Sequence, residues 1–241
     1  MTDSKPDSQL ASQQPRYWRW ALYVLGAVVL LAVLYGVGRL IHVSLGSFYT
    51  GERGPYLQQP APTAMTLRWQ TTEAEIGVVR YGLRHDQLEW QAQEQSMGEG
   101  HEVRLIGLQP DTRYYYAIGP EEKPTYAGPD FWFYTPPRRG DSVSTRFVVL
   151  GDPGYPNPRQ RAVQDVMQTW LELNPRPDRP NFDLLLTTGD NAYRSGTNKQ
   201  FQAGFFEPYA NWLRNVPVWP VYGNHDARRW AFFNLFSFPK D

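Results

Sequence analysis

The sequence predicts three parts in succession: a membrane-spanning helix, an all-β sandwich and half of a parallel α/β domain. Three patterns support this prediction. They are an uncharged apolar run near the N-terminus, short segments in which apolar and polar residues alternate, and a final part in which strand-like runs alternate with helical spacing. With 241 residues, the chain has room for one large domain or two small ones. We place the tail, helix, sandwich, linker and α/β part at residues 1–17, 18–45, 53–135, 136–145 and 146–241.

The composition excludes several classes of function. The 24 basic residues balance the 24 acidic ones, so the chain has no electrostatic signature of a nucleic-acid partner. Cysteine is absent, which excludes disulfides, thiolate metal sites and a cysteine nucleophile. The 9 tryptophans and 15 tyrosines favour β-rich structure over disorder.

The apolar run begins at Trp20 and carries no charge as far as Gly38. Its length matches the roughly 20 residues that cross a bilayer, and aromatic residues flank it as they do at membrane interfaces. These are Tyr17, Trp18 and Trp20 on one side and Phe48 and Tyr49 on the other. A cleaved signal peptide and a buried core helix are the competing interpretations. The run is longer than a usual signal-peptide core, and no convincing A-x-A cleavage site follows it.

Basic residues near the run set its predicted orientation. Those before it slightly outnumber those close behind it, which favours a cytoplasmic N-terminus. They are Lys5, Arg16 and Arg19 before the run and Arg39 and Arg53 after it. We therefore predict a signal anchor at 18–45, through which the chain associates with the membrane, with everything after residue 46 outside.

The sandwich is predicted from strand-like segments with one wet face. MTLRWQT and IGVVRYG alternate apolar and polar residues, and HEVRLIG and RYYYAIG form a second pair. In β-sandwiches, a tyrosine that follows a Pro-Asp-Thr corner bonds back to the backbone. The segment resembles the fibronectin type III pattern L-x-P-x-T-x-Y at Leu108, Pro110, Thr112 and Tyr114. The resemblance implies a scaffold or docking module, in which His85 and His101 are surface histidines.

The last part has the rhythm of a parallel α/β sheet. RFVVL, FDLLLTT and VPVWPVYG are short apolar runs that predict strands. The segments 157–173 and 199–215 between them suit helices, the second broken near Pro208. Alternating strands and helices imply right-handed crossovers between parallel strands. The apolar residues that define the first helix are Ala162, Val163, Val166, Met167, Trp170 and Leu171.

All three predicted strands end in glycine followed by polar residues. A single Gly-Asp at a strand end is ordinary turn chemistry, but the carboxyl ends of parallel strands share one edge, where α/β sheets bind ligands. The residues that follow the strands are Asp152, then Asp190 and Tyr193, then Asn224, His225 and Asp226. We therefore expect two carboxylates, a phenol, an amide and an imidazole to gather on one rim.

Such a set suits metal ions. Oxygen-rich ligands with a histidine fit Fe, Mn, Zn or Mg, and two neighbouring carboxylates repel each other unless a proton or cation lies between them. A pair of ions roughly 3.5–4 Å apart can clamp the oxygens of a phosphoryl group.

The motifs GD-x-G, GD-x-x-Y and GNH-[DE], in this order, resemble the metallophosphoesterase superfamily and, more narrowly, the purple acid phosphatases. Gly154 stands where many relatives carry a histidine ligand, and Tyr193 is present where a phenolate could replace it. The stretch RGPYLQ, at the start of the fibronectin-like part, is likewise similar to members of this family.

The resemblance implies a metal ligand at four positions. Asp152 and Tyr193 would hold a first ion, usually Fe(III), and Asp190 would bridge it to a second. Asn224 would bind that second ion, which would be divalent Fe, Zn or Mn.

The resemblance also implies roles for the two residues that follow Asn224. His225 would lie beside the phosphate and assist the leaving group or the transition state; its alternative is simply to cap the following turn. Asp226 would either orient His225 or lie in a surface turn.

After the third motif the sequence departs from the family pattern. That pattern continues with a lone histidine and a G-H-x-H segment, which complete both metal sites. The four histidines here are His42, His85, His101 and His225, so none follows position 225. We therefore expect an incomplete part of a larger enzyme, with little or no phosphatase activity in these 241 residues alone.

Three functions remain open. The first is a membrane-anchored phosphatase that acts on a phosphorylated small molecule or ester, with its catalytic part periplasmic or extracellular. A phosphodiesterase or nucleotide pyrophosphatase of the same superfamily is the second. The third is a non-catalytic, anchored binding module with a degenerate metal site. The sequence leaves the oligomeric state undetermined.

Overall fold

The computed structural model describes residues 17–47, 49–177, 179–226 and 230–239. These form two compact units, which divide after Leu45.

The first unit consists of one long helix, α1 (Tyr17–Ser47). Within it, Trp18–Ile41 has a mean hydropathy of 2.3 and none of its side chains is buried by the protein. A helix that is apolar on all sides in this way is typical of a membrane span. The helix is therefore long and apolar enough to cross a bilayer, although a signal sequence at the same position would share these properties.

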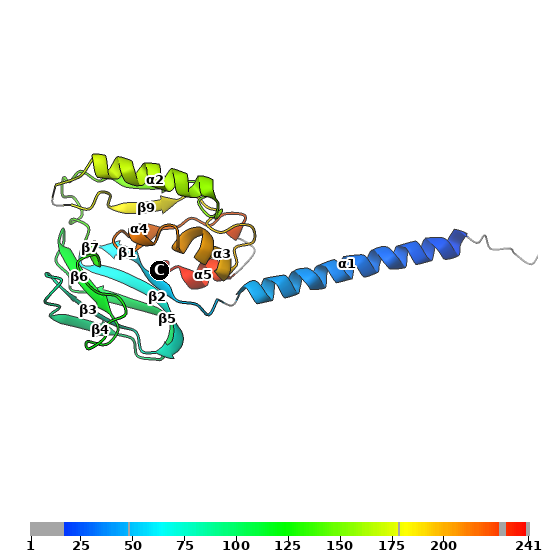
Figure 1. Ribbon diagram of the computed structural model, residues 1–241, viewed down its shortest axis with the longest axis horizontal. Helices are drawn as coiled ribbons and strands as arrows, with labels where there is room; N and C mark the ends of the chain where they lie inside the picture. The colour runs from blue at the N-terminus through cyan, green and yellow to red at the C-terminus, as the bar shows by residue number, and fades with distance from the viewer. Residues whose placement is uncertain (1–16, 48, 178, 227–229, 240–241) are drawn as a thin grey trace, which may run out of the picture. The chain divides into compact units, whose positions relative to one another are not determined.

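The second unit begins with a β-sandwich of two antiparallel sheets (Figure 1). The three-stranded sheet has the order β1-β2-β5, and the four-stranded sheet has the order β4-β3-β6-β7. The strands are β1 (Arg53–Ala61), β2 (Ala64–Glu75), β3 (Val78–Gly82), β4 (Trp90–Gln93), β5 (Gly98–Ile106), β6 (Arg113–Ile118) and β7 (Trp132–Tyr134).

Alternating side chains fill the space between the two sheets. In β5, every second residue from His101 to Leu105 is buried, as expected for a strand with one wet face. The predicted tyrosine corner is confirmed: the Tyr114 hydroxyl accepts a hydrogen bond of 2.9 Å from the Gln109 backbone N–H. Together these features give the sandwich a core of its own, formed by Leu57, Met65, Leu67, Trp69, Val79, Val103, Leu105, Leu108, Tyr114, Tyr116, Ile118 and Phe133.

The prediction that His101 is a surface histidine is wrong. Its side chain is fully buried and stacks on Trp69 with ring centroids 4.7 Å apart. The imidazole lies 2.7 Å from Glu94 Oε2 and 2.9 Å from Thr71 Oγ1, so both ring nitrogens have partners. A buried histidine is tolerated when its polar atoms are paired. His85, by contrast, is exposed as predicted.

After the linker, three short strands form a parallel sheet with the order β10-β9-β8. In register, Phe147 pairs with Leu184, and Leu185 pairs with Val218. The strands are β8 (Phe147–Leu150), β9 (Leu184–Thr187) and β10 (Val218–Trp219). Helix α2 (Pro158–Leu173) connects the first two, capped by Asn157, whose side chain accepts a hydrogen bond from the Gln160 N–H.

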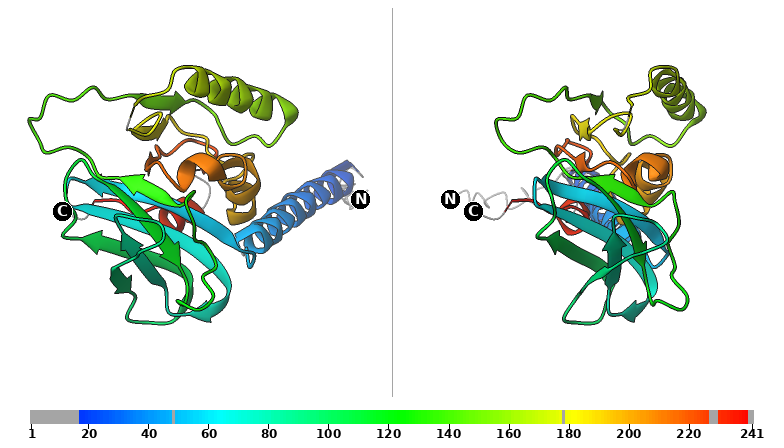
Figure 2. Two further views of the ribbon diagram at one scale, coloured as in Figure 1. Left: turned by 60° about the vertical axis from the view of Figure 1, so that its left-hand side comes forward. Right: turned by 90° about the vertical axis from the view of Figure 1, so that its left-hand side faces the viewer.

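The segment between β9 and β10 is helical but broken. It comprises α3 (Asn198–Phe201), the π-helical turn η1 (Gln202–Phe206) and α4 (Ala210–Leu213), with the break at the predicted Pro208. A short helix, α5 (Ala231–Leu235), follows β10. This segment and α2 lie on the same side of the parallel sheet (Figure 2).

Helix α2 buries only part of its predicted apolar face. Leu171 is buried and Met167 packs against the core, whereas Val163, Val166 and Trp170 are exposed. Glutamines of the same helix add hydrogen bonds to the broken helix. The Gln160 and Gln164 amides donate to the Gly204 and Pro208 carbonyls, and Gln168 Oε1 accepts from Trp212 Nε1 at 2.6 Å. A broken helix leaves carbonyls without intrahelical partners. The glutamines satisfy these carbonyls, which an apolar face could not do.

The sandwich and the α/β part share an aromatic core. Tyr56 of β1 packs on Phe206 and Phe236, with ring centroids 4.7 and 6.3 Å apart. Its hydroxyl donates to the Leu235 carbonyl at 2.6 Å, and Leu57 of β1 forms a parallel bridge with Pro217, just before β10. The two parts are therefore interlocked, which is why they belong to one compact unit.

Truncation of this shared core should be costly. Phe236 is 2% exposed, so Phe236→Ala is expected to lower the free energy of unfolding by about 3–5 kcal/mol, because the cavity cannot close fully. Phe233→Ala on the same segment is the control, since that ring is 49% exposed and its loss should cost roughly 1 kcal/mol or less. Urea unfolding of the chain in detergent measures both. Equal losses would contradict the shared core.

Candidate functional site

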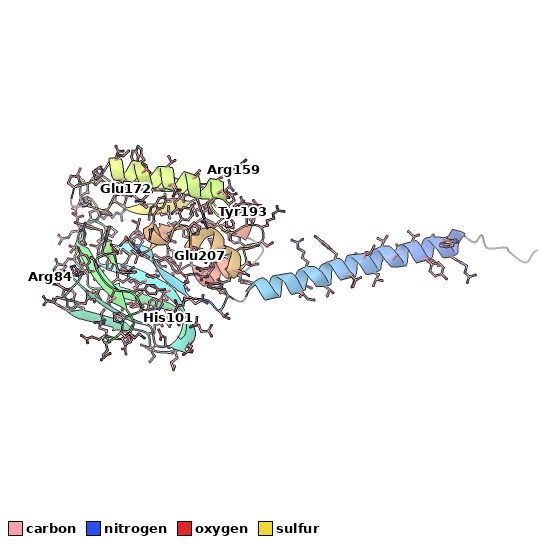
Figure 3. The ribbon with its side chains drawn as sticks, viewed as in Figure 1. Arg84, His101, Arg159, Glu172, Tyr193 and Glu207 are labelled. Carbon is pink, nitrogen blue, oxygen red and sulfur yellow. The ribbon has the colours of Figure 1, made fainter. Side chains whose placement is uncertain are left out.

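Three of the predicted side chains meet where β8 and β9 end. The Tyr193 hydroxyl lies 2.8 Å from Asp152 Oδ1 and 3.1 Å from Asp190 Oδ2. Figure 3 labels the Tyr193 side chain in the α/β part. The single proton of the hydroxyl is therefore shared between two acceptors. Two carboxylates held this close repel each other unless a proton or a cation lies between them, and here the phenol proton lies between them.

The backbone at both carboxylates is in the left-handed region. Asp152 has a φ of 50° and Asp190 a φ of 53°. Aspartate adopts this region more readily than most residues, yet it still costs energy relative to an extended strand. Strained residues of this kind gather at functional sites when the surrounding structure holds them in place. Here the strain turns both carboxylates to the same rim, directly after their strands end.

A close approach of two loops explains the glycine in the first motif. Gly154 N–H donates to the Asp190 carbonyl at 3.2 Å, and Tyr193 N–H donates to the Gly154 carbonyl at 3.1 Å. A Cβ at position 154 would collide with the Asn191 carbonyl carbon. Position 154 therefore cannot carry a histidine in this backbone arrangement, and the aromatic side chain at the rim is Tyr193 on the opposite loop.

His225 is joined to the same cluster from the third strand end. Its backbone N–H donates to Asp190 Oδ1 at 2.8 Å, and its ring lies 4.4 Å from the Tyr193 ring. Nδ1 lies 2.8 Å from the Arg194 carbonyl oxygen. A carbonyl can only accept, so Nδ1 carries the proton and Nε2 is the nitrogen left free to exchange one. Asn224, which precedes His225, is exposed on the same turn.

Asp226 does something other than either predicted role. It is 0% exposed, so it is no surface turn residue, and its carboxylate bonds backbone N–H groups and the Asn191 amide rather than the His225 ring. Oδ2 accepts from Asn191 N, Asn191 Nδ2 and Gly223 N at 3.1, 2.8 and 3.1 Å, and Oδ1 accepts from Ala192 N at 3.1 Å. Asp226 therefore clamps the loop after β9 to the loop after β10.

Two partners at the site were not predicted. Asn191 bonds Asp226, and its place in the Gly-Asp-Asn turn could have suggested that role. The Arg194 carbonyl orients His225. Because it is a backbone group, the types of residue in the sequence do not predict it.

Two acidic groups of the rim have raised pKa values. Burial and the hydrogen bonds to Asp152 and Asp190 raise the pKa of the Tyr193 phenol. Burial likewise raises the pKa of Asp226, against the lowering effect of its hydrogen bonds. A cation reverses this effect for its ligands, because it replaces the proton.

The donor set fits a hard cation. Two carboxylates and a phenol converge, and an amide lies on the adjoining turn; oxygen donors of this type suit Fe, Mn or Mg. Within the part of the chain that the structure describes, no three His, Cys, Asp or Glu side chains gather into a metal-binding group. The residues present therefore offer an oxygen-rich donor set for a hard cation.

Comparison with known proteins identifies both folded parts. Residues 54–135 match the purple acid phosphatase N-terminal domain, and residues 145–241 match the calcineurin-like phosphoesterases. A phosphoenolpyruvate phosphatase from Allium cepa is 41% identical over 54 residues, which are 22% of this chain and 10% of that protein. A purple acid phosphatase from Glycine max is 26% identical over 142 residues, which are 59% of this chain and 22% of that protein.

The fold is also found among solved structures. A purple acid phosphatase from yellow lupin (Lupinus luteus) seeds has a TM-score of 0.59 and 18% identity. The match covers 78% of this chain and 41% of that one. This chain therefore spans less than half of each of these relatives.

Removing the Asp226 charge should destabilise the rim. Asp226→Asn places an NH₂ against backbone N–H donors, so the free energy of unfolding is expected to fall by about 2–4 kcal/mol. Asp152→Asn is the matched control: that residue is exposed, and losing its charge relieves repulsion, so stability should change by less than about 1 kcal/mol. Thermal unfolding followed by circular dichroism compares the two. An unchanged free energy of unfolding in Asp226→Asn would show that the Asp226 hydrogen bonds do not stabilise the rim.

Proposed function

We propose that this chain takes part in phosphate monoester hydrolysis at a dinuclear metal centre. The premise is that the chain carries a purple acid phosphatase N-terminal domain followed by a calcineurin-like metallophosphoesterase domain. The observation that carries the proposal is the Tyr193 phenol shared between Asp152 and Asp190. Both carboxylates lie on residues in the left-handed backbone region, a conformation that gathers at functional sites. The substrate would be a phosphorylated small molecule or ester.

The residues of the rim divide into ligands and a proton-exchanging group. Asp152 and Tyr193 would hold a first ion, Fe(III), and Asp190 would serve both ions. Asn224 would hold the second, divalent Fe, Zn or Mn. When bound, such ions supply a nucleophile near neutral pH and polarise the phosphoryl group.

His225 would act on the ester itself. Its Nδ1 is held by the Arg194 carbonyl, which leaves Nε2 to donate a proton to the leaving oxygen or to hydrogen-bond the phosphate. The ring contact with Tyr193 fixes the imidazole beside the ligands. An imidazole oriented in this way can bind a phosphate oxygen without binding a metal.

Ferric iron gives a direct test of the ligand assignment. A ferric ion bound to a tyrosinate absorbs visible light, so the chain in detergent, supplied with Fe(III), should become coloured. Tyr193→Phe is expected to abolish the band, because it removes the phenolate oxygen. Tyr155→Phe is the matched control: Tyr155 lies beside Tyr193, with ring centroids 5.7 Å apart, but makes no bond to either carboxylate among the described residues.

A colourless wild-type chain would contradict the assignment and favour an anchored binding module instead. The same sample tests hydrolysis of a phosphate monoester after addition of Fe and Zn. These 241 residues contain no histidine after His225, so the second ion would keep Asp190 and Asn224 alone. We expect little or no turnover from this chain even where the band is present.

We further propose that α1 anchors the protein in a membrane with its N-terminus in the cytoplasm. The support is the all-round apolar character of Trp18–Ile41 and the slight excess of basic residues before it. The folded unit after Gly46 would then lie in the periplasm or outside the cell.

Alkaline extraction tests the anchor. The chain should stay in the membrane pellet, whereas Leu30→Arg combined with Val33→Arg should release part of it, since each central arginine costs about 2.5–3.5 kcal/mol of insertion. A tag after Asp241 should be open to external protease, and a tag before Met1 should be protected. Loss of the N-terminal tag from the mature protein would indicate a cleaved signal peptide instead.

A further inference from the structure

Arg53 is a buried cation at the junction of the two folded parts. It lies on β1 and is 2% exposed, and among the described residues it forms no ion pair. Phe206 lies against its guanidinium at 4.3 Å, and burial lowers the pKa of the group. A charge without a counterion is costly to bury, so its neutral partners determine what it does.

Arg53 Nη1 donates to Gln70 Oε1 of β2 at 3.3 Å, within the sandwich, and its other two hydrogen-bond acceptors belong to the segment that follows the Tyr193 loop. Arg53 Nη2 donates to Asn198 Oδ1 at 2.5 Å, and Nε donates to Gln202 Oε1 at 2.9 Å. Asn198 is the first residue of α3, and Gln202 is the first residue of η1. Charged donors make stronger hydrogen bonds than neutral ones. A side chain of the β-sandwich therefore holds the start of the helical segment in the α/β part.

A second set of bonds continues from α3 to the rim. Gln200 Oε1 accepts from Ser195 N at 3.0 Å and from Thr197 N at 3.1 Å, and Thr197 Oγ1 accepts from Gln200 N at 3.2 Å. The turn formed by residues 194–197 is thus tied to the helix that Arg53 holds.

This turn reaches the proposed ligands directly. The Arg194 carbonyl orients His225, and Tyr193 immediately precedes it. Gly196 lies so close to the third strand end that a Cβ there would come within 2.8 Å of Asp226 Cα. A displacement of residues 194–197 would therefore move both the phenol and the imidazole.

Arg68, on the adjacent strand β2, provides a contrast. It also reaches from the sandwich to the α/β part, donating to Asn234 O at 2.6 Å and Ser237 Oγ at 3.0 Å. Those partners lie at α5 and beyond it, away from the Tyr193 loop. Both arginines thus join the sandwich to the α/β part, but only Arg53 bonds the segment that follows the Tyr193 loop. Comparing their variants distinguishes general attachment from an effect on the rim.

We propose that Arg53 is a positioning residue: through Asn198 and Gln202 it holds the 194–197 turn so that Tyr193 and His225 keep their places at the rim. This inference rests on the proposed function for its chemical meaning, since it assigns the sandwich a part in building the metal site. Its structural content can be tested without any metal.

Amide hydrogen exchange, read by mass spectrometry on the metal-free chain in detergent, tests that content. In Arg53→Gln, peptides that contain residues 193–197 should exchange roughly tenfold faster, the effect of losing a charged hydrogen bond. Arg68→Gln should leave these peptides unchanged and affect peptides near 234–237. Asn198→Ala removes one acceptor and leaves the arginine in place, so it provides the same test where Arg53→Gln fails to fold. Equal exchange at 193–197 in the Arg53 and Arg68 variants would overturn the proposal.

Ferric titration gives a readout that loss of stability alone would not shift. If the wild type shows the tyrosinate band, Arg53→Gln and Asn198→Ala should need roughly tenfold more Fe(III) for half-maximal absorbance. Arg68→Gln should match the wild type. A wild type without the band refutes the proposed metal site. The hydrogen-exchange comparison would still test the positioning role of Arg53, because it uses the metal-free chain. A normal band and normal exchange in Arg53→Gln and Asn198→Ala would show that Arg53 only stabilises the junction.

Discussion

The buried Asp226 carboxylate is the interaction on which the arrangement of the rim depends. Four donors converge on it from the loop after β9 and from the turn that begins at Gly223. It is fully buried, so water cannot replace a lost donor, and each bond must be present for the charge to be tolerated. This requirement brings Asp190 and His225, which flank the bonded residues, close enough for the His225 N–H to bind the Asp190 carboxylate.

The same requirement explains the glycines around the rim. Loops joined at so many points run backbone to backbone, and side chains at Gly154 or Gly223 would collide with residues 190–192. Close packing of this kind leaves aspartates in left-handed conformations, a cost that the surrounding bonds offset. The result is a rigid oxygen-lined rim, and rigid positioning of ligands is what a metal site requires.

The β-sandwich contributes to this rigidity beyond being attached. Tyr56 places its ring in the core of the α/β part, and Arg53 bonds the helix that follows the Tyr193 loop. The sequence pattern did not indicate all of these side-chain contacts. The apolar spacing of α2 suggested a buried face, of which Leu171 and Met167 do pack inward, but it gave no sign that glutamines of this helix satisfy carbonyls of the broken helix beside it. His101 looked like a surface residue until Trp69, Thr71 and Glu94 came together around it.

The sequence alone determined which chemistry is available. Glycine-ended strands in a parallel order deliver Asp152, Asp190, Tyr193 and His225 to one edge, because local pattern and sheet topology are enough to place strand ends. The tertiary structure decided which partners those groups have. It made Asp226 a clamp, gave His225 the Arg194 carbonyl and connected Arg53 to the rim. These contacts join segments far apart in the chain and often involve backbone atoms, which carry no residue-specific signal. Only packing in three dimensions can select them.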